Sequence, residues 1–199
     1  MHVILLLHVV NIYCIKAILL PKTIIAGVVW NVVQVDFKTT NLSAFTPLDV
    51  IEKVVSSQGW RLNRLREEEI AAEYHGRWCE YSLHFAWSKE IQALHFTCAF
   101  DIRIPANKTN DVNNLLALIN DKLWLGHFCV WQEEVLPMFR HAFPLRGVDC
   151  IEAQQIEDLL EIAITECEKF YPAFQYVIWG NKNPNEALEA SILEPIGRA

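Results

Sequence analysis

Two histidines form the most suggestive pair of chemistry-bearing residues in this chain. His84 and His95 lie in neighbouring segments that alternate between apolar and polar residues. If the segments are adjacent antiparallel strands in a register that places His84 opposite His95, the two imidazoles meet on one face. Glu80 and Asp101 fall on that face, so the ligand types of a zinc site are present. Ordinary polar strand positions explain the same pattern more simply, and we expect no metal or other cofactor.

Cysteine chemistry is the second possibility. The six cysteines are widely spaced and form no C-x-x-C pair, which is typical of a reduced chain with small buried thiols. A register shifted by two residues would instead place Cys79 opposite Cys98 as packed thiols. A nucleophilic Cys129 with His127 or His141 is conceivable, but neighbouring strand positions supply no orienting third group. No catalytic site is therefore predicted.

Composition disfavours several other classes of protein. The seven glycines are well separated, so neither a P-loop nor a dinucleotide-binding fingerprint can be formed. The chain has 17 Lys+Arg against 24 Asp+Glu and a net charge of -7, which disfavours nucleic-acid binding despite its seven tryptophans. Arg140 and His141 could together hold an anion, although a surface strand pair is the simpler interpretation. We predict that the protein is not an enzyme and does not bind nucleic acid.

The elements that would position these residues can be read from residue 44 onward. Thr46, Pro47 and Asp49 supply a capping hydroxyl, a proline at the first helical position and a carboxylate three residues after the cap. They predict a helix over 47–58 that ends at Gly59. The period then changes to two, which predicts an antiparallel meander of four strands at 61–65, 69–74, 78–87 and 91–102.

One face of the last two of these strands is strongly apolar. Its ten members should face the core: Cys79, Tyr81, Leu83, Phe85, Trp87, Leu94, Phe96, Cys98, Phe100 and Ile102. The opposite face carries Trp78, Ala86, Ala93 and Ala99 beside polar residues. Such a face is too apolar to be purely solvated, which predicts a homodimer with Trp78 or its neighbours in the interface.

The second half of the chain adds helices and two more strands. Apolar spacing predicts a helix over 112–123, closed by Gly126, followed by strands at 127–131 and about 138–143. Pro137 indicates an edge strand or a strand start. A long helix begins near Glu152 and must kink or restart at Pro172, and Asn183 caps a last helix that ends near residue 193.

These elements define the fold class as α+β, with a sheet of about six antiparallel strands and helices on one face. Their order is α-β-β-β-β-α-β-β-α-α. Residues 152–199 carry nine acidic side chains, which form either a solvated helix surface or a docking surface for a basic partner.

The beginning of the chain has a different composition. Residues 1–35 contain 25 hydrophobic positions and two charges, Lys16 and Lys22. The apolar run 3–20 is interrupted by polar residues and makes a poor transmembrane helix, and it lacks the marks of a signal peptide. A membrane anchor, an extra structured element and an extension that the domain does not need all remain open. We expect 1–43 to be dispensable, 44–196 to be a single domain, and the location to be cytoplasmic, with membrane association through 3–20 as the alternative.

Six segments together resemble the bacterial YbjN family. They are PLDVIE (47–52), GRWCEY (76–81), LHFTCAFD (94–101), LWLGHF (123–128), PMFRH (137–141) and EKFYPAFQ (168–175). The resemblance covers about residues 44–196. It implies a sensory-transduction regulator with a fold like that of the small α+β chaperones of type III secretion, and it supplies no catalytic residues. It covers none of the first 40 residues, which favours an extension over a functional anchor.

Two functional classes follow from these observations. The favoured one is a non-enzymatic regulatory or chaperone-like domain that binds protein partners, with a homodimer as its expected assembly. The alternative is a small-ligand sensor or enzyme that uses the sheet face carrying His84 and His95. A concave face with converging polar groups would favour the alternative, and a flat, self-complementary face would favour the protein partner.

We predict that a protein starting at Leu42 folds without the preceding residues, because every capping and periodicity signal lies downstream. Its melting temperature, followed by circular dichroism, should equal that of the full chain. A decrease of more than about 5 °C, or roughly 1 kcal/mol for a domain of this size, would show that the first 41 residues are part of the folded structure.

Overall fold

The computed structural model describes residues 23–25, 28–30, 46–148 and 151–193. The chain divides into two compact units, 1–43 and 44–199. In the first unit, β1 (Thr23–Ile25) pairs antiparallel with β2 (Val28–Trp30). The apolar run 3–20 lies outside the described residues. No helix within the described ranges is both long enough and apolar enough to span a membrane.

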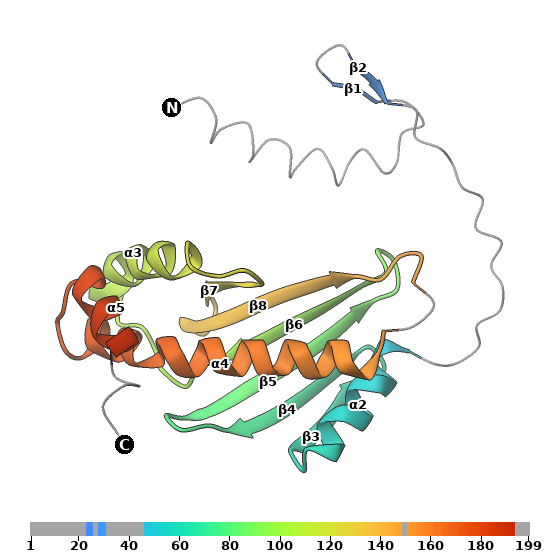
Figure 1. The fold of residues 1–199 in the computed structure, drawn as a ribbon, viewed down its shortest axis with the longest axis horizontal. Helices are drawn as coiled ribbons and strands as arrows, with labels where there is room; N and C mark the ends of the chain where they lie inside the picture. Colours follow the sequence, from blue (N-terminus) through green and yellow to red (C-terminus); the bar gives the residue numbers. More distant parts are fainter. Residues whose placement is uncertain (1–22, 26–27, 31–45, 149–150, 194–199) are drawn as a thin grey trace. The chain divides into compact units, whose positions relative to one another are not determined.

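The second unit has the predicted α+β order (Figure 1). Its elements are α2 (Pro47–Ser57), β3 (Arg61–Arg66), β4 (Glu69–His75), β5 (Glu80–Ser88), β6 (Ala93–Ala99), α3 (Thr109–Asn120), β7 (His127–Trp131), β8 (Leu136–Pro144), α4 (Ala153–Ile178) and α5 (Pro184–Leu193). A short 3-10 turn, η1 (Ala106–Lys108), precedes α3. The fold class and the sequence of elements are thus confirmed.

All six strands of the second unit form one antiparallel sheet in the order β3-β4-β5-β6-β8-β7. The first four strands are the predicted meander. The last hairpin, β7–β8, joins the meander because β8 pairs with β6. The strand that comes first in the sequence, β7, is therefore the edge strand. Pro137 therefore lies near the start of an interior strand, and its carbonyl accepts a hydrogen bond of 3.0 Å from the Phe100 N–H. Of the two alternatives predicted for Pro137, an edge strand or a strand start, the strand start is the one observed.

The register between β5 and β6 differs from both registers considered for it. His84 lies opposite Thr97, and His95 lies opposite Ala86, so the two imidazoles share a face but are diagonal neighbours. The pairing closes at Ser88 opposite Ala93. The loop between them places Gln92 at a positive φ of 50°, a turn conformation that apolar and polar alternation does not reveal.

The alternative register, which would place Cys79 opposite Cys98, is not observed either. Cys98 lies opposite Leu83, and Cys79 precedes the first residue of β5. The Cys98 Sγ instead lies 3.6 Å from the Sγ of Cys167, which comes from α4 and is fully buried. The contact that the sequence assigned to two strands is made between the sheet and a helix.

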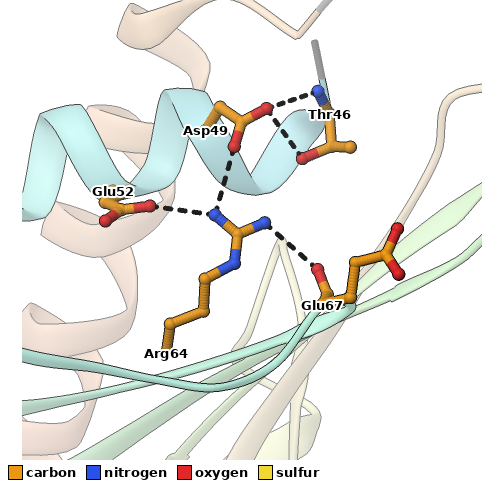
Figure 2. A network of polar contacts seen from close by, with 5 residues as sticks. All are labelled: Thr46, Asp49, Glu52, Arg64 and Glu67. Carbon is orange, nitrogen blue, oxygen red and sulfur yellow. Dashed lines mark hydrogen bonds and ion pairs between the residues drawn. The ribbon is translucent and has the colours of Figure 1, made fainter. Parts of the chain in front are cut away.

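Helix α2 is attached to the first hairpin by a network of polar contacts, which Figure 2 shows. The Asp49 carboxylate accepts hydrogen bonds from the Thr46 N–H (2.7 Å) and hydroxyl (3.0 Å). Arg64 on β3 donates to Asp49 (3.2 Å), to Glu52 (3.0 Å) and to the Glu67 carbonyl (3.1 Å). The Thr46 backbone hydrogen bond is the main cause of the lowered pKa of Asp49, and Arg64 lowers it further. The predicted helix start is confirmed.

Helix α4 lies along one face of the sheet (Figure 1). Phe100 packs on Phe174 and Tyr171 with ring centroids 5.2 and 5.4 Å apart, and Phe128 lies 6.1 Å from Phe174. The helix runs through Pro172 from Ala153 to Ile178, so of the two alternatives predicted there, a kink or a restart, the restart is excluded. Proline in a helix costs about 3 kcal/mol. Burial of aromatic side chains on both sides of Pro172 offsets this cost.

Trp78 does not lie on the face where the sequence placed it. It precedes the first residue of β5, so strand alternation does not determine its direction. Its ring stacks on Tyr171 at 6.3 Å, and its Nε1 donates to the Glu168 carbonyl at 3.0 Å. The Arg77 N–H donates to the Glu168 carboxylate at 2.7 Å. Trp78 therefore joins the helix-covered side of the sheet, and the predicted dimer interface around it loses its basis.

The helices leave the other face of the sheet open. Helix α2 packs on β3, β4 and β5, α3 packs on β7, and α5 packs on α3 and α4. Along β5 the residues that face these helices, Tyr81, Leu83 and Phe85, are buried, whereas the alternating residues are exposed or half-buried. The described part of the second unit thus has one packed face and one open face.

Removal of the hydroxyl group from each of two tyrosines in the packed layer should have different effects on the unfolding free energy. The Tyr81 hydroxyl is buried and has no hydrogen-bond partner within the described residues, whereas the Tyr171 hydroxyl donates to Asp101 at 3.0 Å. Because an unpaired buried polar group is unfavourable, Tyr81→Phe should leave the unfolding free energy unchanged or raise it, while Tyr171→Phe should lower it by about 1 kcal/mol. Urea denaturation measures both. Equal destabilisation by the two variants would contradict this account.

Candidate functional site: the hollow face of the sheet

The face of the sheet opposite the helices, which we call the hollow face, carries a large cavity. Alternate residues of all six strands point to this face, and they line a volume of about 730 Å³. The cavity extends from Arg61 on edge strand β3 to Trp131 on edge strand β7. Both edges of a sheet can line one cavity only if the sheet curves towards that side. The hollow face is therefore concave rather than flat.

The concavity has a floor of small and flexible apolar side chains. Ala71 lies on β4, Ala99 on β6 and Met138 on β8, and Ala99 and Met138 are directly paired and buried. Alanine leaves space that a larger side chain would fill. The Trp131 side chain is 41% exposed at the β7 end. The exposed surface of the lining is mainly apolar, although eight of the fifteen lining residues have polar or charged side chains.

Arg140 is the most unusual polar group on this face. Its Nε and Nη2 lie 3.2 and 3.0 Å from the His95 Nε2. Because a guanidinium can only donate, the His95 Nε2 must be the unprotonated acceptor in this contact. Of the carboxylates that the structure describes, none forms an ion pair with Arg140. Arg140 is half-buried, so its charge is only partly solvated.

The electrostatics around Arg140 favour neutral neighbours. Burial lowers the pKa of His95, and the positive charge of Arg140 lowers it further. His127, opposite Arg140 on β7, has its pKa lowered by the same two causes in the same order. Burial raises the pKa of the Cys129 thiol, although Arg140 acts in the opposite direction. At neutral pH this group of residues therefore holds one positive charge and no thiolate.

The predicted histidine pair is only partly brought together. His84 and His95 both line the cavity, but each lies opposite another residue across the strand pair. The His84 Nε2 lies 3.9 Å from a carboxylate oxygen of Glu69, and His95 contacts Arg140 instead. The two imidazoles thus have separate partners.

The two acids considered as further metal ligands do not converge with the histidines. Glu80 contacts His75 at the far end of the β4–β5 pair. Asp101 lies beyond the end of β6 and accepts the Tyr171 hydrogen bond. Among the described residues no group of three or more His, Cys, Asp or Glu side chains could hold a metal ion.

Arg140 and His141 do not form a joint anion site, because successive strand residues point to opposite faces. The His141 ring lies 4.6 Å from Phe143 and lines a second cavity of about 270 Å³ between β8 and α4. Sequence reasoning named Arg140 but missed the contribution of Trp131 and Met138 to the same cavity. Alternation within β7 and β8 could assign Trp131 and Met138 to one face of their own strands. It does not predict the strand order that brings those two strands next to each other and to β6.

The fold and the hollow face define a class: an α+β domain whose antiparallel sheet is packed by helices on one side and hollowed on the other. Residues 47–176 match the model of the YbjN family, described as "Putative bacterial sensory transduction regulator". The chain belongs to the YbjN family. No curated protein matches the sequence.

A similar solved structure is the "Crystal structure of YbjN, a putative transcription regulator from E. coli". The two proteins are 11% identical, and the match covers 62% of this chain and 94% of that chain with a TM-score of 0.42. Family membership rests on the sequence match over 47–176.

We predict that the His95 ring titrates below the ordinary histidine pKa of 6.5. Because the native ring stays neutral while the unfolded ring takes up a proton, the unfolding free energy should fall as pH drops below about 6.5. Arg140→Gln should move the midpoint upward, since one of its causes is removed. NMR of the imidazole protons between pH 5 and 8 measures the titration midpoint of His95 in the wild type and in the Arg140→Gln variant. Arg103→Gln, which removes an exposed cation paired with Glu134, serves as the control and should change nothing. A wild-type midpoint at or above 6.5 would refute the assignment.

Proposed function

We propose that this protein is a non-enzymatic regulator whose hollow face is its recognition surface. The observation that carries the proposal is the cavity of about 730 Å³ that crosses the sheet. Ligand-binding pockets commonly enclose about 300 to 1,000 Å³, are mainly apolar and contain a few polar groups that orient the ligand. The cavity has a volume in this range and a mainly apolar exposed surface, and its polar groups include Arg140, which forms an ion pair with none of the described carboxylates. A sensing role also suits the description of the family to which the chain belongs.

The state of the reactive groups supports binding rather than catalysis. A nucleophilic cysteine needs a lowered thiol pKa and an adjacent base. Burial raises the pKa of the Cys129 thiol, and the His95 Nε2 is already the acceptor for Arg140. The polar groups of the hollow face are thus suited to holding a ligand, with no activated nucleophile among those described.

A protein partner is the second candidate, and a different surface favours it. Trp124, in the turn before β7, is 99% exposed, and Leu125 beside it is also exposed. Exposed aromatic residues of this kind commonly mark protein contacts. A chaperone-like function and a homodimer would use this surface more readily than the hollow face, because two concave faces brought together enclose empty space.

Two further parts of the proposal concern location and the acidic helices. The four described cysteines are free thiols, which suits a reducing compartment such as the bacterial cytoplasm. Most acids of α4 and α5, including Glu157, Glu161 and Glu189, are exposed, as expected of a solvated helix surface. We propose that the protein acts in the cytoplasm and that its recognition surface is the hollow face rather than these helices.

Filling the cavity should abolish regulation without unfolding the domain. Thr97→Trp places a large side chain on the half-buried centre of the hollow face, whereas Thr165→Trp makes the same exchange on the exposed side of α4. In the source bacterium, deletion of the gene should change the transcript profile. Wild type and Thr165→Trp should restore the profile, and Thr97→Trp should not.

Circular dichroism of both variants shows whether they are folded. Full restoration by a folded Thr97→Trp protein would refute the hollow face as the recognition surface. A deletion strain whose transcripts match the parent under every tested condition would refute the regulatory role itself.

A further inference from the structure

The charges that line the cavity of the hollow face do not cancel. Of the residues that line this cavity, three carry formal charges: Arg61, Glu73 and Arg140. Arg61 and Glu73 are directly opposite across β3 and β4 and form an ion pair of 3.1 Å. Arg140 therefore leaves the cavity with one positive charge that no described carboxylate balances.

The guanidinium of Arg140 also has donors to spare. It has five N–H donors, and its contact with His95 uses the Nε and Nη2 groups. Burial and the neighbouring guanidinium lower the pKa of His95, so the imidazole adds no charge and remains an acceptor at neutral pH. His95 thus holds Arg140 in place and leaves its charge available to an anion. A planar guanidinium is well suited to the two oxygens of a carboxylate.

Apolar surface lies directly beside this charge. Met138 is two residues from Arg140 on the same strand face, a separation of about 7 Å. Ala99 is paired with Met138, and Trp131 lines the same cavity from β7. A ligand that reaches Arg140 with one end would therefore lie on an apolar floor along the rest of its length.

We propose that the hollow face binds a small organic monocarboxylate, with its carboxylate on Arg140 and its apolar body on Ala99, Met138 and Trp131. The inference rests on the proposed function and names the chemical class of the ligand. A single unbalanced cation matches a single anionic group, because Arg61, the other cation of the cavity, is already paired with Glu73. A bound cation would be repelled by Arg140.

The test uses octanoate as the probe, with octanamide as its uncharged analogue and octanedioate as its dianion. Titrations of the full chain by NMR, with the Trp131 indole as reporter, should show octanoate binding tighter than either analogue by roughly tenfold, the effect of one charge-assisted hydrogen-bond pair. Arg140→Gln should weaken octanoate binding by about the same factor and leave octanamide binding unchanged. Arg103→Gln, outside the cavity, should leave octanoate binding unchanged.

Equal affinity for octanoate and octanamide would overturn the proposal, as would unchanged octanoate binding by a folded Arg140→Gln protein. If that variant does not fold, the comparison of the three probes on the wild type decides. Tighter binding of an extended peptide than of octanoate would replace the small ligand with a protein segment.

The failure of this inference can be told apart from the failure of the proposed function. If the wild-type protein does not bind octanoate and Thr97→Trp still fails to restore the transcript profile, only the monocarboxylate proposal is refuted. Restoration by a folded Thr97→Trp protein refutes the recognition surface and the monocarboxylate together.

Discussion

The packing of helix α4 against one face of the sheet is the constraint on which the rest of the structure depends. Phe100, which follows β6, and Phe128 on β7 pack against the aromatic stripe of α4 around Phe174. The burial of this aromatic layer stabilises α4 enough for the helix to continue through Pro172, although proline removes one backbone hydrogen bond. Because the large side chains are gathered on this side, the opposite face of the same strands is left to small and polar residues.

The hollow face follows from that asymmetry. A sheet that is packed on one side only can curve away from its helices, and small residues at Ala71 and Ala99 leave space inside the curve. The curvature brings side chains of both edge strands to one cavity. It also determines the electrostatics, because the cross-strand pair of Arg61 and Glu73 neutralises itself while Arg140 faces a neutral imidazole.

This division between the two faces explains how a regulator can be built on a stable domain. Stability resides in the buried layer under α2 and α4, where the core residues form one continuous cluster. Substitutions on the hollow face remove few buried contacts, so its chemistry can change without loss of the fold. The exposed Trp124 lies in a turn outside the cavity and offers a separate surface for a protein contact. Ligand recognition and partner binding would then occupy different parts of one small domain.

The sequence by itself determined the local elements, because their causes are local. Capping at Thr46 and Asp49, the period of two in the strands and the apolar stripe of α4 each lie within a short stretch of chain. Alternation also identified which side chains of β5 and β6 face the core, and the quoted segments indicated the YbjN family. Tertiary structure decided the register of β5 against β6 and the direction of the Trp78 side chain. It also decided that β8, rather than β7, pairs with β6. These features depend on a positive φ at Gln92, on a turn packed against α4 and on strand order, which is why Arg140 and Trp131 were recognised as parts of one cavity only in the folded chain.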